Sequence, residues 1–94
     1  MPTVVHGDFE WDADKAAQNV ANHGVTIEEA ALAMRDLLSV DFDDLAQPEN
    51  IVTLATSPNG ATLYIVSTDR DDRIRIISAR KATTHERRIL QEGD

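Results

Sequence analysis

The residues best suited to chemistry lie in one stretch near the end of the chain, RIRIISARKATTHERR, residues 73–88. These sixteen residues contain six of the nine Lys and Arg side chains of an acidic protein, and a single carboxylate, Glu86. Arginine carries a planar set of donors that matches phosphate oxygens and stays charged at physiological pH. Several converging arginines can stabilise the charge that develops on a phosphoryl group during cleavage. The stretch therefore indicates a phosphate site.

Strand periodicity divides these arginines between two faces. The alternation in RIRIISA places Arg73 and Arg75 on one face and two isoleucines on the face toward the core. Arg80 has the opposite parity, so it joins them only if the strand twists, bulges or ends near residues 78–79. In the helix expected next, His85 and Arg88 are three residues apart and share a face.

Two interpretations of this stretch remain open on charge alone. In the first, His85 or Glu86 transfers protons beside the arginines. In the second, the arginines form an ordinary solvated surface and pair with nearby acids such as Asp69, Asp71 and Asp72, each pair contributing about 0–1 kcal/mol. Glu86 is ambiguous too, because it follows Thr83 by three residues, the spacing of a capping box. Charge alone favours the solvated surface.

Other kinds of site have little support. The three histidines, His6, His23 and His85, are scattered and show no metal-ligand spacing, and cysteine is absent. There is no phosphate-binding P-loop, dinucleotide fingerprint or nucleophile elbow. We therefore predict neither a metal nor a cofactor.

The elements that must position these residues begin with two helices. Asp12 is suited to cap a first helix, with Ala13, Ala16, Ala17 and Val20 as its apolar side, and Gly24 to end it in the left-handed conformation. Thr26 and Glu29 have capping-box spacing at the start of a second helix.

The rest of the chain alternates as strands do. Predicted strands cover the region around Val40 and Phe42 and residues 51–56, 61–69 and 73–79, with a short additional strand within residues 4–9 and a final helix over residues 83–92. The predicted fold class is α+β, with two N-terminal helices packed on an antiparallel sheet of three to five strands and a C-terminal helix. At 94 residues, we expect one domain, 1–94.

Charge is distributed unevenly within the net charge of −8. Residues 1–50 sum to −9 and residues 51–94 to +1, so a local basic surface could attract a polyanion. No apolar run is long enough for a membrane span, and the N-terminus lacks a signal segment. We expect a cytoplasmic protein.

Two blocks of sequence resemble the BrnT family of bacterial type II toxins. They are FEWDADKAAQNVANHGVTIEEA, residues 9–30, and RIRIISARKATTHERR, residues 73–88. The resemblance implies a small RelE-like ribonuclease that cleaves RNA without a metal and is neutralised by a BrnA-like antitoxin. It also implies that the toxin works as a dimer or as a toxin–antitoxin heterotetramer.

Candidate roles follow from combining this resemblance with the chemistry. Cleavage by the RNA's own 2′-hydroxyl needs a base, an acid and positive charge near the phosphate. The catalytic candidates are Arg75, Arg80, Glu86 and Arg87, with Glu86 as the base. The RNA-binding candidates are Lys15, Arg73, His85 and Arg88, and His85 or Lys15 are secondary candidates for proton transfer.

The chain departs from the family pattern at two positions that matter for activity. The family commonly has a lysine where this chain has Asn22 and a tyrosine where it has Leu90. These departures motivate an alternative, a catalytically weakened, non-enzymatic protein-binding module of the same fold. A third hypothesis, a stand-alone phosphate or nucleotide sensor, rests on the arginines alone.

Overall fold

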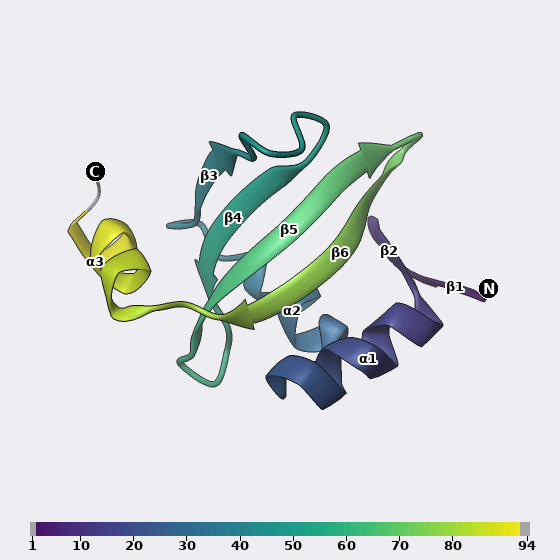
Figure 1. The fold of residues 1–94 in the computed structure, drawn as a ribbon, viewed down its shortest axis with the longest axis horizontal. Helices are drawn as coiled ribbons and strands as arrows, with labels where there is room; N and C mark the ends of the chain where they lie inside the picture. The colour runs from purple at the N-terminus through teal and green to yellow at the C-terminus, as the bar shows by residue number, and fades with distance from the viewer. Residues whose placement is uncertain (1, 93–94) are drawn as a thin grey trace.

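The computed structural model describes residues 2–92, which form one six-stranded sheet and three helices (Figure 1). In chain order the elements are β1 Thr3–His6, β2 Phe9–Asp12, α1 Ala13–His23, α2 Ile27–Ala33, β3 Val40–Asp43, β4 Ile51–Thr56, β5 Thr62–Arg70, β6 Arg73–Lys81 and α3 Thr84–Glu92. The predicted α+β class is confirmed. None of the helices in residues 2–92 is long and apolar enough to cross a membrane.

The sheet is larger than predicted and is not purely antiparallel. Its strand order is β1-β2-β6-β5-β4-β3, and the pair β2–β6 is parallel. The prediction of three to five antiparallel strands is therefore wrong in both respects. The difference arises at the N-terminus, where Gly7 adopts a positive φ of 62° and lets residues 3–12 fold back as a hairpin. The second strand of this hairpin then pairs with β6.

Helices α1 and α2 pack against one face of the sheet. In Figure 1, α2 lies behind β5 and β6, and α1 lies below β6. The core between them contains mainly small and branched apolar side chains and the rings of Phe9 and Trp11. Cross-strand partners share a face, so β5 and β6 send Ile65, Ile76 and Ala79 into this core. We call the opposite side of β5 and β6 the open face.

Helix α1 contacts the sheet through a polar residue that the apolar pattern did not predict. Ala17 and Val20, expected on the buried side, are exposed, whereas Asn19 is buried. The Asn19 amide donates to the carbonyls of Val25 and Ala79, at 2.9 and 2.8 Å, and its oxygen accepts from the Ala79 N–H at 3.1 Å. The side chain thus substitutes for a neighbouring strand at the edge of β6, beyond the point where β2 stops pairing.

The helix caps are as predicted. Asp12 accepts from the backbone N–H groups of residues 14 and 15 at the start of α1, and Gly24 ends that helix with a φ of 70°. Thr26 accepts from the Glu29 N–H at the start of α2. Helix α3 packs against β4 and contains no fully buried residue among those described. It is therefore a loosely attached element that carries charged side chains beside the sheet.

Candidate active site on the open face of the sheet

A β-bulge in β6 decides which arginines share a face. Ile77 has no partner in β5, because the cross-strand register shifts between Val66 and Ser67. This extra residue reverses the alternation of side chains, so Arg80 lies on the same side of the sheet as Arg75. The irregularity that the sequence required for Arg80 to join the other arginines is therefore present.

Arg80 is the centre of a compact group on the open face. Its Nη1 and Nη2 atoms donate to the two carboxylate oxygens of Glu86, at 2.8 and 3.0 Å. Its guanidinium carbon lies 3.8 Å from the centroid of the Tyr64 ring, which is its direct partner across β5 and β6. A cation over an aromatic face is held electrostatically as well as by contact. The guanidinium is thus fixed from two sides, while the Arg80 side chain remains 37% exposed.

Glu86 has a structural role in addition to its bond with Arg80. Its Oε1 accepts from the Thr83 backbone N–H at 2.8 Å, and the Glu86 N–H donates to the Thr83 hydroxyl at 3.2 Å, which completes the predicted capping box. The hydrogen bonds from Arg80 lower the pKa of the Glu86 carboxyl, against the opposing effect of partial burial. The same carboxylate raises the pKa of Arg80. Both groups are therefore charged at neutral pH.

Arg75 is held by a different acid. Its Nη1 donates to Oε2 of Glu10 in β2 at 2.5 Å, and both side chains are largely covered. Within residues 2–92 the only ion pairs are Arg75–Glu10 and Arg80–Glu86. Two of the arginines therefore do pair with carboxylates, but not with Asp69, Asp71 or Asp72.

The predicted catalytic arginines do not converge on one point. At about 3.3 Å per residue, the Cα atoms of Arg75 and Arg80 lie roughly 15 Å apart along β6. Arg73 is exposed at the hairpin end of the same strand, farther still from Arg80. The structure thus brings Arg80 and Glu86 together and leaves Arg73 and Arg75 apart from them.

The remaining candidates on α3 are exposed. His85, Arg87 and Arg88 lie on the helix that Glu86 caps, and Arg87 donates to the Thr84 hydroxyl at 3.2 Å. Their side chains are therefore exposed on the same helix, α3, that the Glu86–Arg80 pair joins to the sheet.

Lys15, the last candidate, lines a separate polar cavity between α1 and β6, with a volume of about 210 Å³. The lining is Lys15, Gln18, Asn19, Asn22, His23, Ile77 and Ser78. The bulged residue Ile77 forms part of its wall.

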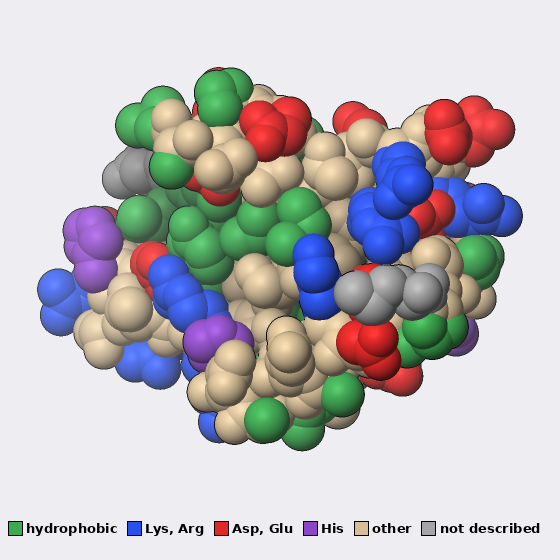
Figure 2. All heavy atoms as spheres, turned by 45° about the vertical axis from the view of Figure 1, so that its right-hand side comes forward, with side chains coloured by type: hydrophobic (Ala, Val, Ile, Leu, Met, Phe, Trp, Pro, Cys, Tyr) green, Lys and Arg blue, Asp and Glu red, His purple; other side chains and the backbone are tan. Residues whose placement is uncertain are grey.

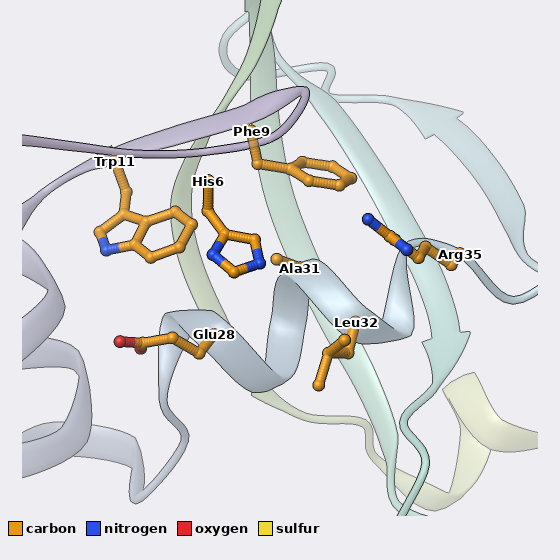
Figure 3. Close-up of a pocket in the computed structure, with 7 residues that line it drawn as sticks. All are labelled: His6, Phe9, Trp11, Glu28, Ala31, Leu32 and Arg35. Atoms are coloured by element: carbon orange, nitrogen blue, oxygen red, sulfur yellow. The ribbon is translucent and has the colours of Figure 1, made fainter.

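A second cavity, of about 140 Å³, lies between the β1–β2 hairpin and α2 and contains none of the predicted site residues (Figure 3). The rings of His6, Phe9 and Trp11 extend from the β1–β2 hairpin toward α2, which supplies the opposite wall. This cavity is apolar, so it does not resemble a phosphate site.

Figure 2 views the molecule from the side of the open face, turned toward the N-terminal hairpin. Hydrophobic side chains gather in the middle of this view, with Lys and Arg side chains on both sides of them. Such a surface combines apolar contact area with local positive charge, which can attract an anion.

Comparisons with known proteins identify the family. Residues 11–86 match the family model described as the ribonuclease toxin BrnT of type II toxin–antitoxin systems. The chain belongs to the BrnT family. Its members are ribonuclease toxins, so an antitoxin is the expected partner.

A solved structure supports the same fold. The chain is similar to the 1.1 Å crystal structure of the Brucella abortus ribonuclease toxin BrnT, with a TM-score of 0.65 and 16% sequence identity. The alignment covers 79% of this chain and 94% of the Brucella toxin. No curated protein sequence matches the chain.

Sequence reasoning missed two residues that contact the predicted arginines, Tyr64 beside Arg80 and Glu10 beside Arg75. The tyrosine that the family commonly has after Glu86 is Leu90 here, yet Tyr64 from β5 places a phenol ring against Arg80. Glu10 lies 65 residues from Arg75 in sequence, so only the parallel pairing of β2 with β6 brings them together.

Proposed function

We propose that residues 1–94 form one BrnT-like toxin domain with a RelE-like fold, which cleaves RNA in the cytoplasm without a metal ion. The observation that carries this proposal is the group of Arg80, Glu86 and Tyr64 on the open face. It combines a fixed guanidinium, an ionised carboxylate and an aromatic ring beside exposed positive charge on α3.

In the proposed reaction the 2′-hydroxyl oxygen attacks the adjacent phosphorus, and the bond from phosphorus to the 5′-oxygen breaks. Arg80 and Arg87 stabilise the negative charge on the phosphoryl oxygens. Glu86 accepts the 2′-hydroxyl proton, and His85 or water protonates the leaving 5′-oxygen. Because Arg80 lowers its pKa, Glu86 is a weak base, so most of the rate enhancement depends on the arginines.

The other candidates act on the RNA strand away from the reacting phosphate. Arg75 and Arg73 lie too far along β6 from Arg80 to share a phosphate with it, so they contact neighbouring phosphates. Arg88 and Lys15 contact other phosphates of the same strand. Tyr64 offers a ring on which a base can stack. The expected substrate is therefore a single RNA strand that lies along the open face.

We further propose that the antitoxin is BrnA-like and that it covers the arginines of the open face, which would block access of RNA. The assembly would be a heterotetramer built on a dimeric antitoxin. A complex in which residues 73–88 remain accessible and RNA is still cleaved would contradict this account of inhibition.

A second candidate function is a non-catalytic protein-binding module. The observation in its favour is that Arg75 and Arg80 are each paired with a carboxylate, which reduces their net charge toward a phosphate. In that case a basic or arginine-bearing partner would bind this acidic chain, and the chain would not cleave RNA.

The test is cleavage of a defined RNA by the purified chain in the presence of EDTA. We expect 2′,3′-cyclic phosphate and 5′-hydroxyl ends, and no cleavage of the same strand with 2′-deoxyribose throughout. The matched variant is Arg80→Ala, with Arg70→Ala at the exposed hairpin end as the control. Intact RNA after incubation with the wild-type chain would favour the binding module instead.

A further inference from the structure

The polar cavity between α1 and β6 has an unusual composition for this chain. Of its described lining residues, Lys15 carries a positive charge and the others are amide, imidazole, hydroxyl and apolar side chains. None is Asp or Glu, although the chain has 17 acidic residues. By contrast, the cavity beside the β1–β2 hairpin includes Glu28, and a further cavity, lined by Thr56, Leu90 and neighbouring residues, includes Asp36. The lining of the α1–β6 cavity is therefore suited to an anion.

The donors of this cavity come from one side of α1. Lys15, Gln18, Asn22 and His23 follow helical spacing, so they form a continuous stripe that faces β6. The neighbouring Asn19 is not available to a ligand, because its amide is fully used by Val25 and Ala79. Asn19 thus holds the helix against the strand, and the flanking residues keep their donors free to bind a ligand.

The position of the cavity relates it to the candidate active site. Ser78, on the opposite wall, lies on the same face of β6 as Arg75 and Arg80 and between them in the strand. The Cα atoms of those two arginines are roughly 15 Å apart. The cavity lies between the two arginines and adds a third group of hydrogen-bond donors. Its volume of about 210 Å³ has room for a phosphate group and several waters, each of which occupies about 30 Å³ in the liquid.

We propose that the α1–β6 cavity binds a backbone phosphate of the RNA strand, next to the phosphate held at Arg80. Lys15 supplies the charge, and Asn22, His23 and Ser78 donate hydrogen bonds to the phosphate oxygens. This site rests on the proposed function, in that the anion is an RNA phosphate rather than a free one. With this site, α1 becomes part of the RNA-binding surface, and the RNA strand runs alongside β6.

Three variants test the charge requirement without disturbing the core, because the substituted residues are exposed. Lys15→Gln and Asn22→Asp should each weaken binding of a fluorescent 2′-O-methyl hexanucleotide, which cannot be cleaved, by up to about fivefold. Lys15→Gln should also reduce the slope of log affinity against log salt by about 1. Asn22→Lys should strengthen binding by a similar factor. The matched control is Ala21→Asp, which adds the same charge one residue away, outside the cavity lining.

Isotope-labelled protein shows where the ligand binds. Titration with the 2′-O-methyl hexanucleotide should shift the amide signals of Lys15, Asn22, His23 and Ser78. Shifts there with inorganic phosphate but not with the hexanucleotide would overturn the assignment to RNA, as would equal effects of Asn22→Asp and Ala21→Asp.

RNA cleavage is measured in parallel. If the wild-type chain cleaves RNA and the cavity signals do not move, this inference fails alone. If it binds the hexanucleotide in the cavity but cleaves nothing, the proposed function fails and the binding site stands.

Discussion

Glu86 holds Arg80 through two parallel hydrogen bonds, of 2.8 and 3.0 Å, while it also caps the helix from which it extends. One carboxylate therefore joins α3 to the sheet and orients the arginine proposed to stabilise the reacting phosphate. A bidentate pair of this kind fixes a guanidinium more precisely in direction than a single contact would.

The first prediction concerns Arg80. Arg80→Lys keeps the positive charge but loses both the fork to Glu86 and the planar stack on Tyr64. We expect Arg80→Ala to lower kcat about 10²–10³-fold, as loss of one charge-stabilising donor does in other enzymes, and Arg80→Lys to restore only part of it. Single-turnover cleavage of a short RNA measures this. Full activity of Arg80→Lys would mean that charge alone suffices at this position.

The second prediction separates stacking from proton transfer at Tyr64. Tyr64→Phe keeps the ring beside Arg80 and removes the hydroxyl, so kcat/KM should stay within about threefold of wild type. Tyr64→Ala removes the ring, and loss of one stacked base costs about 1–3 kcal/mol, so kcat/KM should fall about 10- to 100-fold. A large loss in Tyr64→Phe would instead assign the phenol a role in proton transfer.

The third prediction is the pH dependence of stability. Because the folded-state pKa of Glu86 is lowered, its contribution is fully present above its unfolded pKa, near 4.5, and is lost as pH falls through the lower folded value. This partly exposed pair should contribute up to about 1 kcal/mol. Urea denaturation between pH 3 and 7 measures this. Glu86→Gln should have a lower free energy of unfolding than wild type at pH 7, and that free energy should fall less steeply as the pH is lowered.

Some acid sensitivity should remain in Glu86→Gln. The backbone N–H of Lys15 lowers the pKa of the capping residue Asp12, which therefore titrates in the same window. Glu92→Gln, near the end of α3, is the control, because it removes a carboxylate of the same helix without touching Arg80. An identical pH profile for Glu86→Gln and Glu92→Gln would contradict a special role for the Arg80 pair.

The sequence was sufficient to predict the local elements but not the pairing across the sheet. The caps at Asp12, Thr26 and Thr83 were readable, because each depends on residues within four positions. Extending the β5–β6 register from the turn would pair Tyr64 with Ala79. The bulge at Ile77 moves that pairing to Arg80 instead. One unpaired residue therefore assembles the candidate site, and no local pattern indicated it.

The contact of Arg75 could not be predicted either. It depends on β2, a strand of four residues next to a predicted helix cap, pairing in parallel with β6. The apolar pattern was right for Ala16, which packs against the core, but it placed the exposed Ala17 and Val20 on the buried side and missed Asn19. Polar residues that replace a strand partner carry no hydrophobic signal, so periodicity alone cannot find them.

The last prediction tests that asparagine directly. Asn19→Ala removes the partners of the Ala79 N–H and of the Val25 and Ala79 carbonyls in a buried setting. Each unsatisfied group costs about 1–3 kcal/mol, although relaxation admits water, so we expect a loss of roughly 3 kcal/mol in the free energy of unfolding. Asn19→Asp should be at least as damaging, because a carboxylate would face two carbonyl oxygens.

Chemical denaturation of Asn19→Ala beside Gln18→Ala makes the comparison. Gln18 is the adjacent, exposed residue of α1, and its truncation should change stability by no more than about 0.5 kcal/mol. Since Asn19 fixes α1 at the bulged edge of β6, amide exchange at Ala79 should also become faster in Asn19→Ala and stay unchanged in Gln18→Ala. Equal stability of the two variants would mean that the apolar contacts of α1, and not this amide, hold the helix on the sheet.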